Sequence, residues 1–111
     1  MRRDEARLLD MQLALRDARD FIAGVSREMF LNDKKLQNAV CMKLEVVGEA
    51  ARAISSAFKD CHTDIPWSAV VGLRHRIVHE YFRLDLEVIW EIVDREVAEL
   101  LRLIDPLVQP P

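Results

Sequence analysis

The sequence has few of the residues that make turns: it contains three glycines and four prolines in 111 residues, and two of the prolines are the last two residues. So few turn formers exclude an architecture of many short strands. The two cysteines, Cys41 and Cys61, form no Cys-x-x-Cys pair, so we expect two reduced thiols rather than a disulfide framework. No apolar run approaches the roughly 18 residues of a membrane helix, and the N-terminus has no apolar signal segment. We therefore predict a cytoplasmic protein that does not bind membranes.

The composition is that of a globular chain with charged surfaces. Half of the residues are hydrophobic, 32% are charged, and the net charge is -3. The length predicts a single domain that spans residues 1–111. The net charge excludes a generally basic coat for nucleic acid but not a local basic site, because electrostatic attraction depends on where the charges lie.

Apolar residues recur at steps of three and four through most of the chain, which is the period of an amphipathic α-helix. One predicted helix runs to about Ile22, and a second, longer one begins near Lys34, with Ser26 and Asp33 as N-cap residue types before it. The stripes that define these helices are Leu8, Met11, Leu15, Ala18 and Ile22, then Leu36, Val40, Leu44, Val47, Ala51, Ile54 and Phe58.

Two more helices complete the predicted fold. Pro66 suits the first turn of a third helix, and Asp85 is a cap for a fourth that ends near Pro106. Short links between long helices favour antiparallel neighbours. The sequence therefore predicts an all-α protein, an up-and-down four-helix bundle.

Two features raise the question of helix contacts beyond a simple bundle. The fourth helix carries Trp90, Ile92, Leu101 and Leu103 outside its main stripe, and a homodimer would cover such a wide apolar arc. Gly48, inside the second helix, costs about 1 kcal/mol against alanine. A close approach of two helices would explain this glycine, and a glycine without a role is the alternative.

The segment "GLRHRIVHEYF", residues 72–82, places basic groups among apolar ones. On a helical wheel of about 100° per residue, Arg74 and Tyr81 lie in the middle of an apolar stripe. His79 lies about 140° from Arg74, on the face expected to meet water. Arg74 would then pair with a carboxylate such as Glu45 or Glu49, or open into a cleft that holds an anionic ligand.

The pair His75 and His79 has a spacing that can hold a metal ion, but Arg76 stands where the zinc-protease pattern requires glutamate. We therefore expect no metal site. No glycine-rich loop for phosphate binding is present in the sequence either.

Four residues separate Arg74 from His79, and one residue separates His79 from Tyr81. This spacing resembles the signature of the HEPN superfamily, and specifically of its HepT-like toxins. The segments "LEVVGEAARAIS" and "IPWSAVVGLRHRIVHEYFRLDLEVIWEIV" are similar to the corresponding segments of that family. The resemblance covers roughly residues 5 to 105.

The resemblance implies a helical homodimer, or a higher homo-oligomer, in which the motifs of both chains meet in a cleft. It implies a metal-independent endoribonuclease that needs no cofactor and acts as the toxin of a toxin–antitoxin pair on an RNA substrate. His79 would be the general acid–base, and Arg74 would bind the scissile phosphate. His75 replaces an asparagine that is common in the family, and an accessory role for it stays open. Tyr81 would be the residue to which a nucleotidyltransferase antitoxin transfers AMP.

Two alternatives stay open at this point. The first is a non-catalytic helical interaction module that binds a partner protein or nucleic acid, with Tyr81 as a regulated contact. The second is a protein with a small metal site at His75 and His79.

Overall fold

The computed structural model describes the backbone of residues 2–82 and 85–108, and the side chains of these residues except 2 and 80–82. In the described residues every regular element is helical, as predicted. The elements in chain order are α1 (Arg2–Phe21), α2 (Arg27–Leu31), α3 (Lys34–Arg52), α4 (Ser56–Cys61), α5 (Trp67–Val71), α6 (Leu73–Phe82), α7 (Leu86–Glu91), the π-helical segment η1 (Ile92–Glu96), α8 (Val97–Ile104) and the 3-10 turn η2 (Asp105–Leu107).

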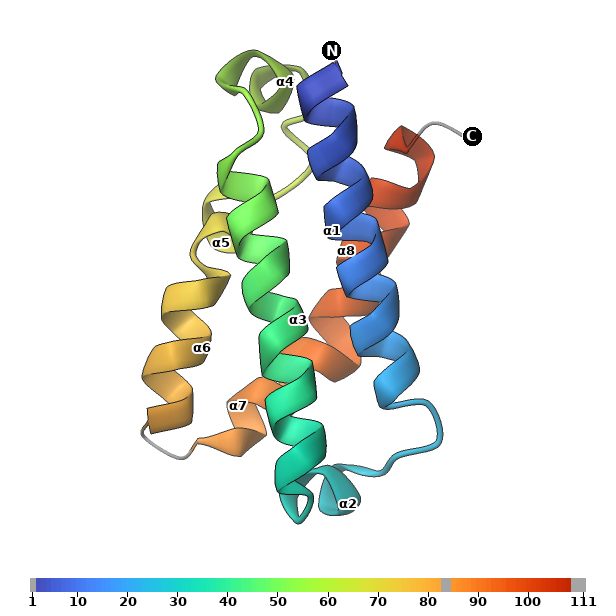
Figure 1. Ribbon diagram of the computed structural model, residues 1–111, viewed down its shortest axis with the longest axis vertical. Helices are drawn as coiled ribbons and strands as arrows, with labels where there is room; N and C mark the ends of the chain where they lie inside the picture. The colour runs from blue at the N-terminus through green and yellow to red at the C-terminus, as the bar shows by residue number, and fades with distance from the viewer. Residues whose placement is uncertain (1, 83–84, 109–111) are drawn as a thin grey trace.

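These elements form four antiparallel segments in an elongated molecule of 42 × 27 × 20 Å. Helix α1 runs down and α3 runs up in Figure 1, then α5 and α6 run down and α7, η1 and α8 return. Helix α3 packs against α1 on one side and against α5 and α6 on the other, and α1 also packs against α8. The predicted up-and-down bundle is confirmed, and α6 lies at one edge of it.

Three predicted N-cap residue types are caps in the structure. Ser26, Asp33 and Asp85 each accept a backbone N–H from the first turn of α2, α3 and α7, at 3.1, 3.1 and 3.4 Å. Each side-chain oxygen satisfies an N–H that has no partner within its helix. Short-range chemistry therefore sets these three helix starts.

The second predicted helix is shorter than its apolar stripe. Helix α3 ends at Arg52, and Ser55 begins α4 by accepting the N–H of Phe58 at 3.2 Å. The Asp4 carboxylate of α1 accepts the backbone N–H of Ser55 at 2.9 Å and its hydroxyl at 2.7 Å. The prediction of one helix to residue 58 was wrong. The apolar spacing continues across the helix break at residues 53–55, and the contact with Asp4 of α1 stabilises that break.

The wide apolar arc of the fourth segment is covered within the chain. Trp90, Ile92 and Leu101 are buried, and Leu103 is half-buried. The π-helical segment η1 adds a residue to the turn and so rotates the apolar face between α7 and α8. This arc is therefore not evidence for a homodimer, contrary to the expectation from the sequence.

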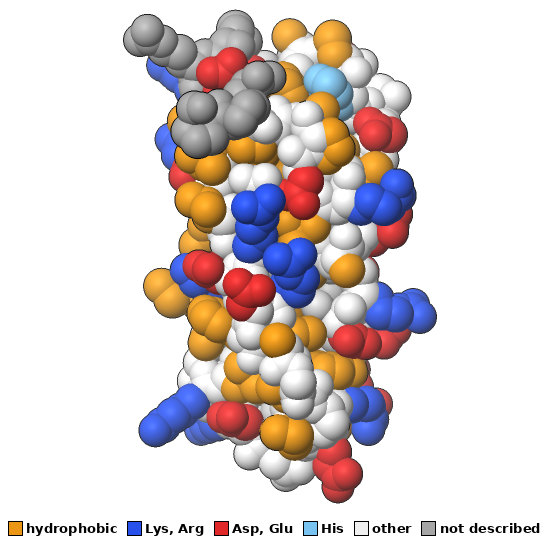
Figure 2. Space-filling view, turned by 90° about the vertical axis from the view of Figure 1, so that its right-hand side faces the viewer, with side chains coloured by type: hydrophobic (Ala, Val, Ile, Leu, Met, Phe, Trp, Pro, Cys, Tyr) orange, Lys and Arg blue, Asp and Glu red, His pale blue; other side chains and the backbone are white. Residues whose placement is uncertain are grey.

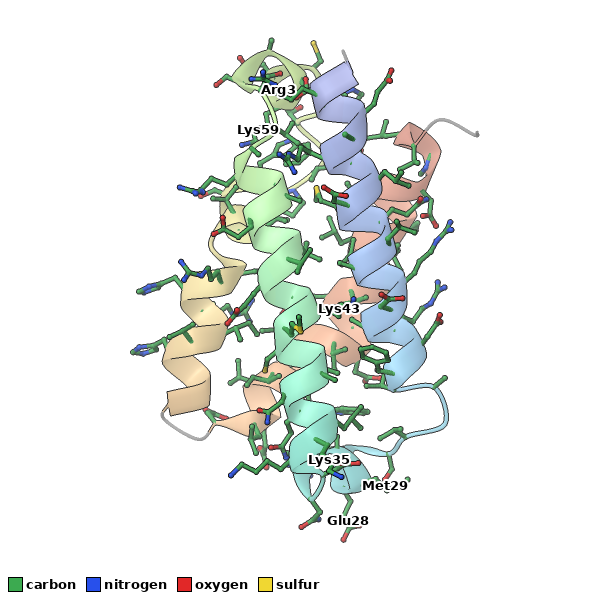
Figure 3. The ribbon with its side chains drawn as sticks, viewed as in Figure 1. Arg3, Glu28, Met29, Lys35, Lys43 and Lys59 are labelled. Carbon is green, nitrogen blue, oxygen red and sulfur yellow. The ribbon has the colours of Figure 1, made fainter. Side chains whose placement is uncertain are left out.

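The surface opposite α6 carries charges of both signs. Figure 2 views the molecule from the side of α1 and α8 and shows Lys and Arg side chains interspersed with Asp and Glu, without a patch of one sign. Lys43, labelled in Figure 3, reaches from α3 to α1, where its Nζ lies 2.9 Å from the carboxylate of Asp17. Among the described residues no helix is long and apolar enough to cross a membrane.

Candidate active site on helix α6

The helix that carries the Arg–His motif is not continuous with the segment before it. Helix α5 ends at Val71, Gly72 caps it, and α6 begins at Leu73. This break shifts the phase of the wheel, so that Leu73 and Ile77, 6% and 1% exposed, point into the core. The side chain of Arg74 is 63% exposed. The prediction that Arg74 lies in the middle of the apolar stripe was therefore wrong.

Gly48 of α3 explains why the junction of α5 and α6 sits so close to the bundle. A Cβ at Gly48 would lie 3.2 Å from the backbone nitrogen of Arg74 and 3.3 Å from the carbonyl oxygen of Val70. A contact of that kind with backbone atoms leaves room for hydrogen only. The close helix approach proposed for Gly48 is confirmed, and it positions the first turn of the motif helix.

Three of the described polar side chains of α6 are open to solvent. Arg74, His75 and His79 are exposed, and Val78 lies among them at 37% exposure. The rings of His75 and His79 stack, with centroids 6.2 Å apart and planes inclined by 12°. Figure 3 shows nitrogen-tipped side chains of α6 that project away from the bundle. The exposure predicted for His79 is confirmed, and the side chain of Tyr81 lies outside the described residues.

Carboxylates from two neighbouring elements contact the arginines of α6. Arg74 Nη1 lies 4.0 Å from Oε1 of Glu49 in α3, and Glu49 was one of the two partners expected from the sequence. Arg76 donates two N–H bonds, of 3.0 and 3.2 Å, to the two carboxylate oxygens of Glu96 in η1. The two bonds between Arg76 and Glu96 connect α6 to the fourth segment. Arg74, by contrast, makes only the long contact with Glu49 among the described residues, and its side chain is accessible to a ligand.

A groove of about 670 Å³ lies beside Arg74, between α1, α3 and α6. The charged side chains that line it are three arginines, Arg7, Arg52 and Arg74, and three carboxylates, Asp10, Glu45 and Glu49. Met42 and Val46 add apolar side chains to the lining. Sequence reasoning missed Arg7 and Arg52, because two isolated arginines on different helices look like ordinary surface residues. Only the packing of α1, α3 and α6 brings Arg7 and Arg52 to the same groove as Arg74.

Among the described residues, no three histidine, cysteine, aspartate or glutamate side chains lie together in a way that could hold a metal ion. His75 and His79 lack a third ligand of this kind there.

The all-helical bundle agrees with the helical fold that the resemblance of the motif to the HEPN superfamily implied. The chain matches the family model described as Ribonuclease HepT-like over residues 11–107, and it belongs to that family. This is a family of ribonucleases, as the resemblance of the motif implied.

The similar proteins include several named as ribonucleases. A protein of Thermococcus cleftensis named as a probable ribonuclease HepT is 37% identical over 93 residues, which cover 84% of each chain. A protein of Methanocaldococcus jannaschii whose name marks it as a candidate RNase is 34% identical over 102 residues, 92% of this chain and 84% of the other. No solved structure matches the chain.

Proposed function

We propose that this protein is a metal-independent endoribonuclease and the toxin of a toxin–antitoxin pair, with Arg74 and His79 as its catalytic residues. The observation that carries the proposal is the shared exposure of these two side chains on α6, in a member of a ribonuclease family. Both side chains are accessible to a substrate as large as RNA.

The two residues suit the two tasks of RNA cleavage. In that reaction the ribose 2′-oxygen forms a bond to phosphorus, and the bond from phosphorus to the 5′-oxygen breaks. An imidazole can both accept and donate a proton, so His79 can take the proton of the 2′-hydroxyl or supply one to the leaving oxygen. Arg74 stays charged and presents a planar set of donors to the phosphate oxygens, whose charge grows in the transition state.

The active form is proposed to be a homodimer with a shared cleft. On one straight helix Arg74 and His79 point about 140° apart, so they do not converge on one phosphate. A second copy of α6, facing the first across a two-fold axis, brings the arginine of one chain next to the histidine of the other. The exposed Val78 between them is an apolar contact available to such an interface.

Control of the toxin is proposed to act through Tyr81. A nucleotidyltransferase antitoxin would join the tyrosine oxygen to the α-phosphorus of ATP and release pyrophosphate. Tyr81 follows His79 by two residues. A nucleotide attached there adds bulk and negative charge beside the motif, and both oppose the binding of RNA.

Variants of the two catalytic residues test the reaction. We expect His79→Ala to reduce the rate of RNA cleavage by about 10² to 10⁴, the usual contribution of a general acid–base. Arg74→Ala is expected to be equally inactive in cells, so both variants should permit growth when expressed without an antitoxin. Arg95→Ala is the matched control, because Arg95 is an exposed arginine on η1 with its own partner, Glu91, at 3.2 Å. Wild-type rates in His79→Ala would refute the mechanism and favour a non-catalytic interaction module. His75→Ala measures any accessory role.

Mixing two inactive variants tests the shared cleft. A heterodimer of Arg74→Ala and His79→Ala keeps one intact arginine–histidine pair only if each pair spans the interface. With random exchange of subunits, about a quarter of the wild-type activity should return. No recovery, in a mixture shown to contain heterodimers, would place both residues of a site on one chain and refute this part of the proposal.

Intact-mass measurement tests the regulation. Co-expression with a nucleotidyltransferase antitoxin should add AMP-sized increments of mass to the wild type and none to Tyr81→Phe. Increments that persist in Tyr81→Phe would show that another residue accepts the nucleotide.

A further inference from the structure

One carboxylate of the groove stands between two arginines. Glu49 Oε1 lies 4.0 Å from Nη1 of Arg74, and Glu49 Oε2 lies 3.4 Å from Nη2 of Arg52. Glu49 and Arg52 are three residues apart on α3, whereas Arg74 comes from α6. A single anionic group therefore contacts guanidinium groups from two helices in the groove.

These contacts are weak and open to solvent. The side chains of Glu49, Arg52 and Arg74 are 49%, 71% and 63% exposed. Ion pairs of this exposure contribute little stability. The contact between Glu49 and Arg74 is also longer than a hydrogen bond. An anion that makes closer contacts with the two guanidinium groups can therefore replace the carboxylate at small cost.

A phosphodiester group fits the same position. Like a carboxylate, it presents two oxygens that share one negative charge, and guanidinium groups bind it with paired N–H donors. Arg7 also lines the groove, and its Nη1 contacts the carboxylate of Asp10, another lining residue, at 3.3 Å. The exposed apolar side chains of Met42 and Val46 in the lining offer contacts to the sugar and base that follow the phosphate.

We propose that Glu49 occupies, in the RNA-free protein, the place that a phosphate of the RNA takes between Arg52 and Arg74. Arg52 is then a second phosphate-binding residue, and the groove between α1, α3 and α6 holds the RNA backbone next to the cleavage site. Glu49 competes with the substrate and so limits affinity. This inference rests on the proposed ribonuclease function, and it adds to that function a second phosphate-binding residue and the surface that holds the RNA.

Binding of a short single-stranded oligoribonucleotide, followed by fluorescence anisotropy over a range of salt concentrations, tests the inference. All variants carry His79→Ala so that the RNA stays intact. Glu49→Gln should tighten binding about three- to tenfold, because it removes a competitor that holds two exposed pairs. Arg52→Ala should weaken binding and lower the slope of log K against log salt by about 0.7, the value for one phosphate contact of a single strand.

The chain offers a matched pair of controls. Glu99 and Arg102 on α8 have the same spacing, order and ion-pair type as Glu49 and Arg52, and they do not line the groove. Glu99→Gln and Arg102→Ala report the effect of net charge alone, and we expect them to change affinity less than twofold. In the double variant Glu49→Gln with Arg52→Ala, the gain from Glu49→Gln should shrink, since the two residues act on one phosphate.

The outcomes separate this inference from the proposed function. If wild type cleaves RNA but the groove variants change affinity no more than the α8 controls, the inference is wrong and the ribonuclease function stands. Weaker binding by Glu49→Gln would also overturn it, because Glu49 would then contact the RNA itself. If the unmodified protein neither binds nor cleaves RNA, the proposed function fails, and this inference fails with it.

Discussion

Replacing Gly48 with alanine sets two effects of opposite sign against each other. In the interior of α3, alanine is preferred to glycine by about 1 kcal/mol, because glycine loses more backbone freedom on folding. The added Cβ would, however, lie 3.2 Å from the backbone nitrogen of Arg74 and 3.3 Å from the carbonyl oxygen of Val70. Backbone atoms cannot rotate away as a flexible side chain can, so the start of α6 must move.

The magnitudes decide the expected sign. Overpacking of this kind costs typically about 1–3 kcal/mol. Subtracting the gain in helix preference leaves a net loss of about 0–2 kcal/mol in the free energy of unfolding. The larger effect is expected on catalysis, because the displaced residue, Arg74, is the one proposed to bind the scissile phosphate. A shift of a few tenths of an ångström at Arg74 should lower the rate of RNA cleavage by about tenfold, given that 1 Å can cost about 10².

Urea unfolding and RNA cleavage measure the two effects separately. The control is a pair of variants at Asn38, an exposed position of the same helix. The difference between Asn38→Ala and Asn38→Gly gives the preference for alanine on α3 without any clash. If Gly48→Ala is stabilised by that full difference and cleaves RNA at the wild-type rate, the close approach has no role in placing Arg74, and the reasoning is refuted.

Three further predictions concern stability and reactivity. Hydrogen bonds from the backbone and the hydroxyl of Ser55 lower the pKa of the Asp4 carboxyl. The ionised carboxylate therefore stabilises the folded protein fully above the ordinary pKa near 4, and this contribution is lost as the pH falls through the lowered pKa. The difference in free energy of unfolding between wild type and Asp4→Asn should therefore shrink below about pH 4. Burial raises the pKa of the Cys41 thiol to about 11, whereas Cys61 is exposed, so a thiol reagent at pH 8 should label only Cys61 in the native protein and both cysteines in urea. Trp67→Phe removes an indole N–H that donates to a backbone carbonyl oxygen at 2.9 Å and should cost about 2 kcal/mol in urea unfolding, with an unchanged midpoint contradicting the role of that bond.

The helices and three of their starts could be read from short-range patterns. Apolar residues at steps of three and four mark the helices, and Ser26, Asp33 and Asp85 cap the next turn with their own side chains. These interactions act over three or four residues, which is why they are visible in a linear sequence. The exposure of His79 followed from the same periodicity.

The orientation of the motif could not be read in this way. A wheel drawn through residues 67–81 assumes one unbroken helix, and a break at Gly72 turns Arg74 from the core to the surface. The break after α3 was concealed for a similar reason, because Asp4 satisfies Ser55 from fifty-one residues away. The π-helical segment η1 likewise lets a single chain bury the wide apolar arc of the fourth segment, which had suggested a homodimer.

The amino-acid sequence was sufficient for the all-helical class, the antiparallel order of the helices and the family to which the arginine–histidine motif belongs. The tertiary structure decided which way Arg74 points, how closely α6 approaches Gly48, and that Glu49 and Arg52 stand beside it. The physical reason is the range of the interactions. Helix period and capping act between neighbours in the chain, whereas a helix break, a backbone contact and a shared ion pair depend on segments that meet only when the bundle has packed.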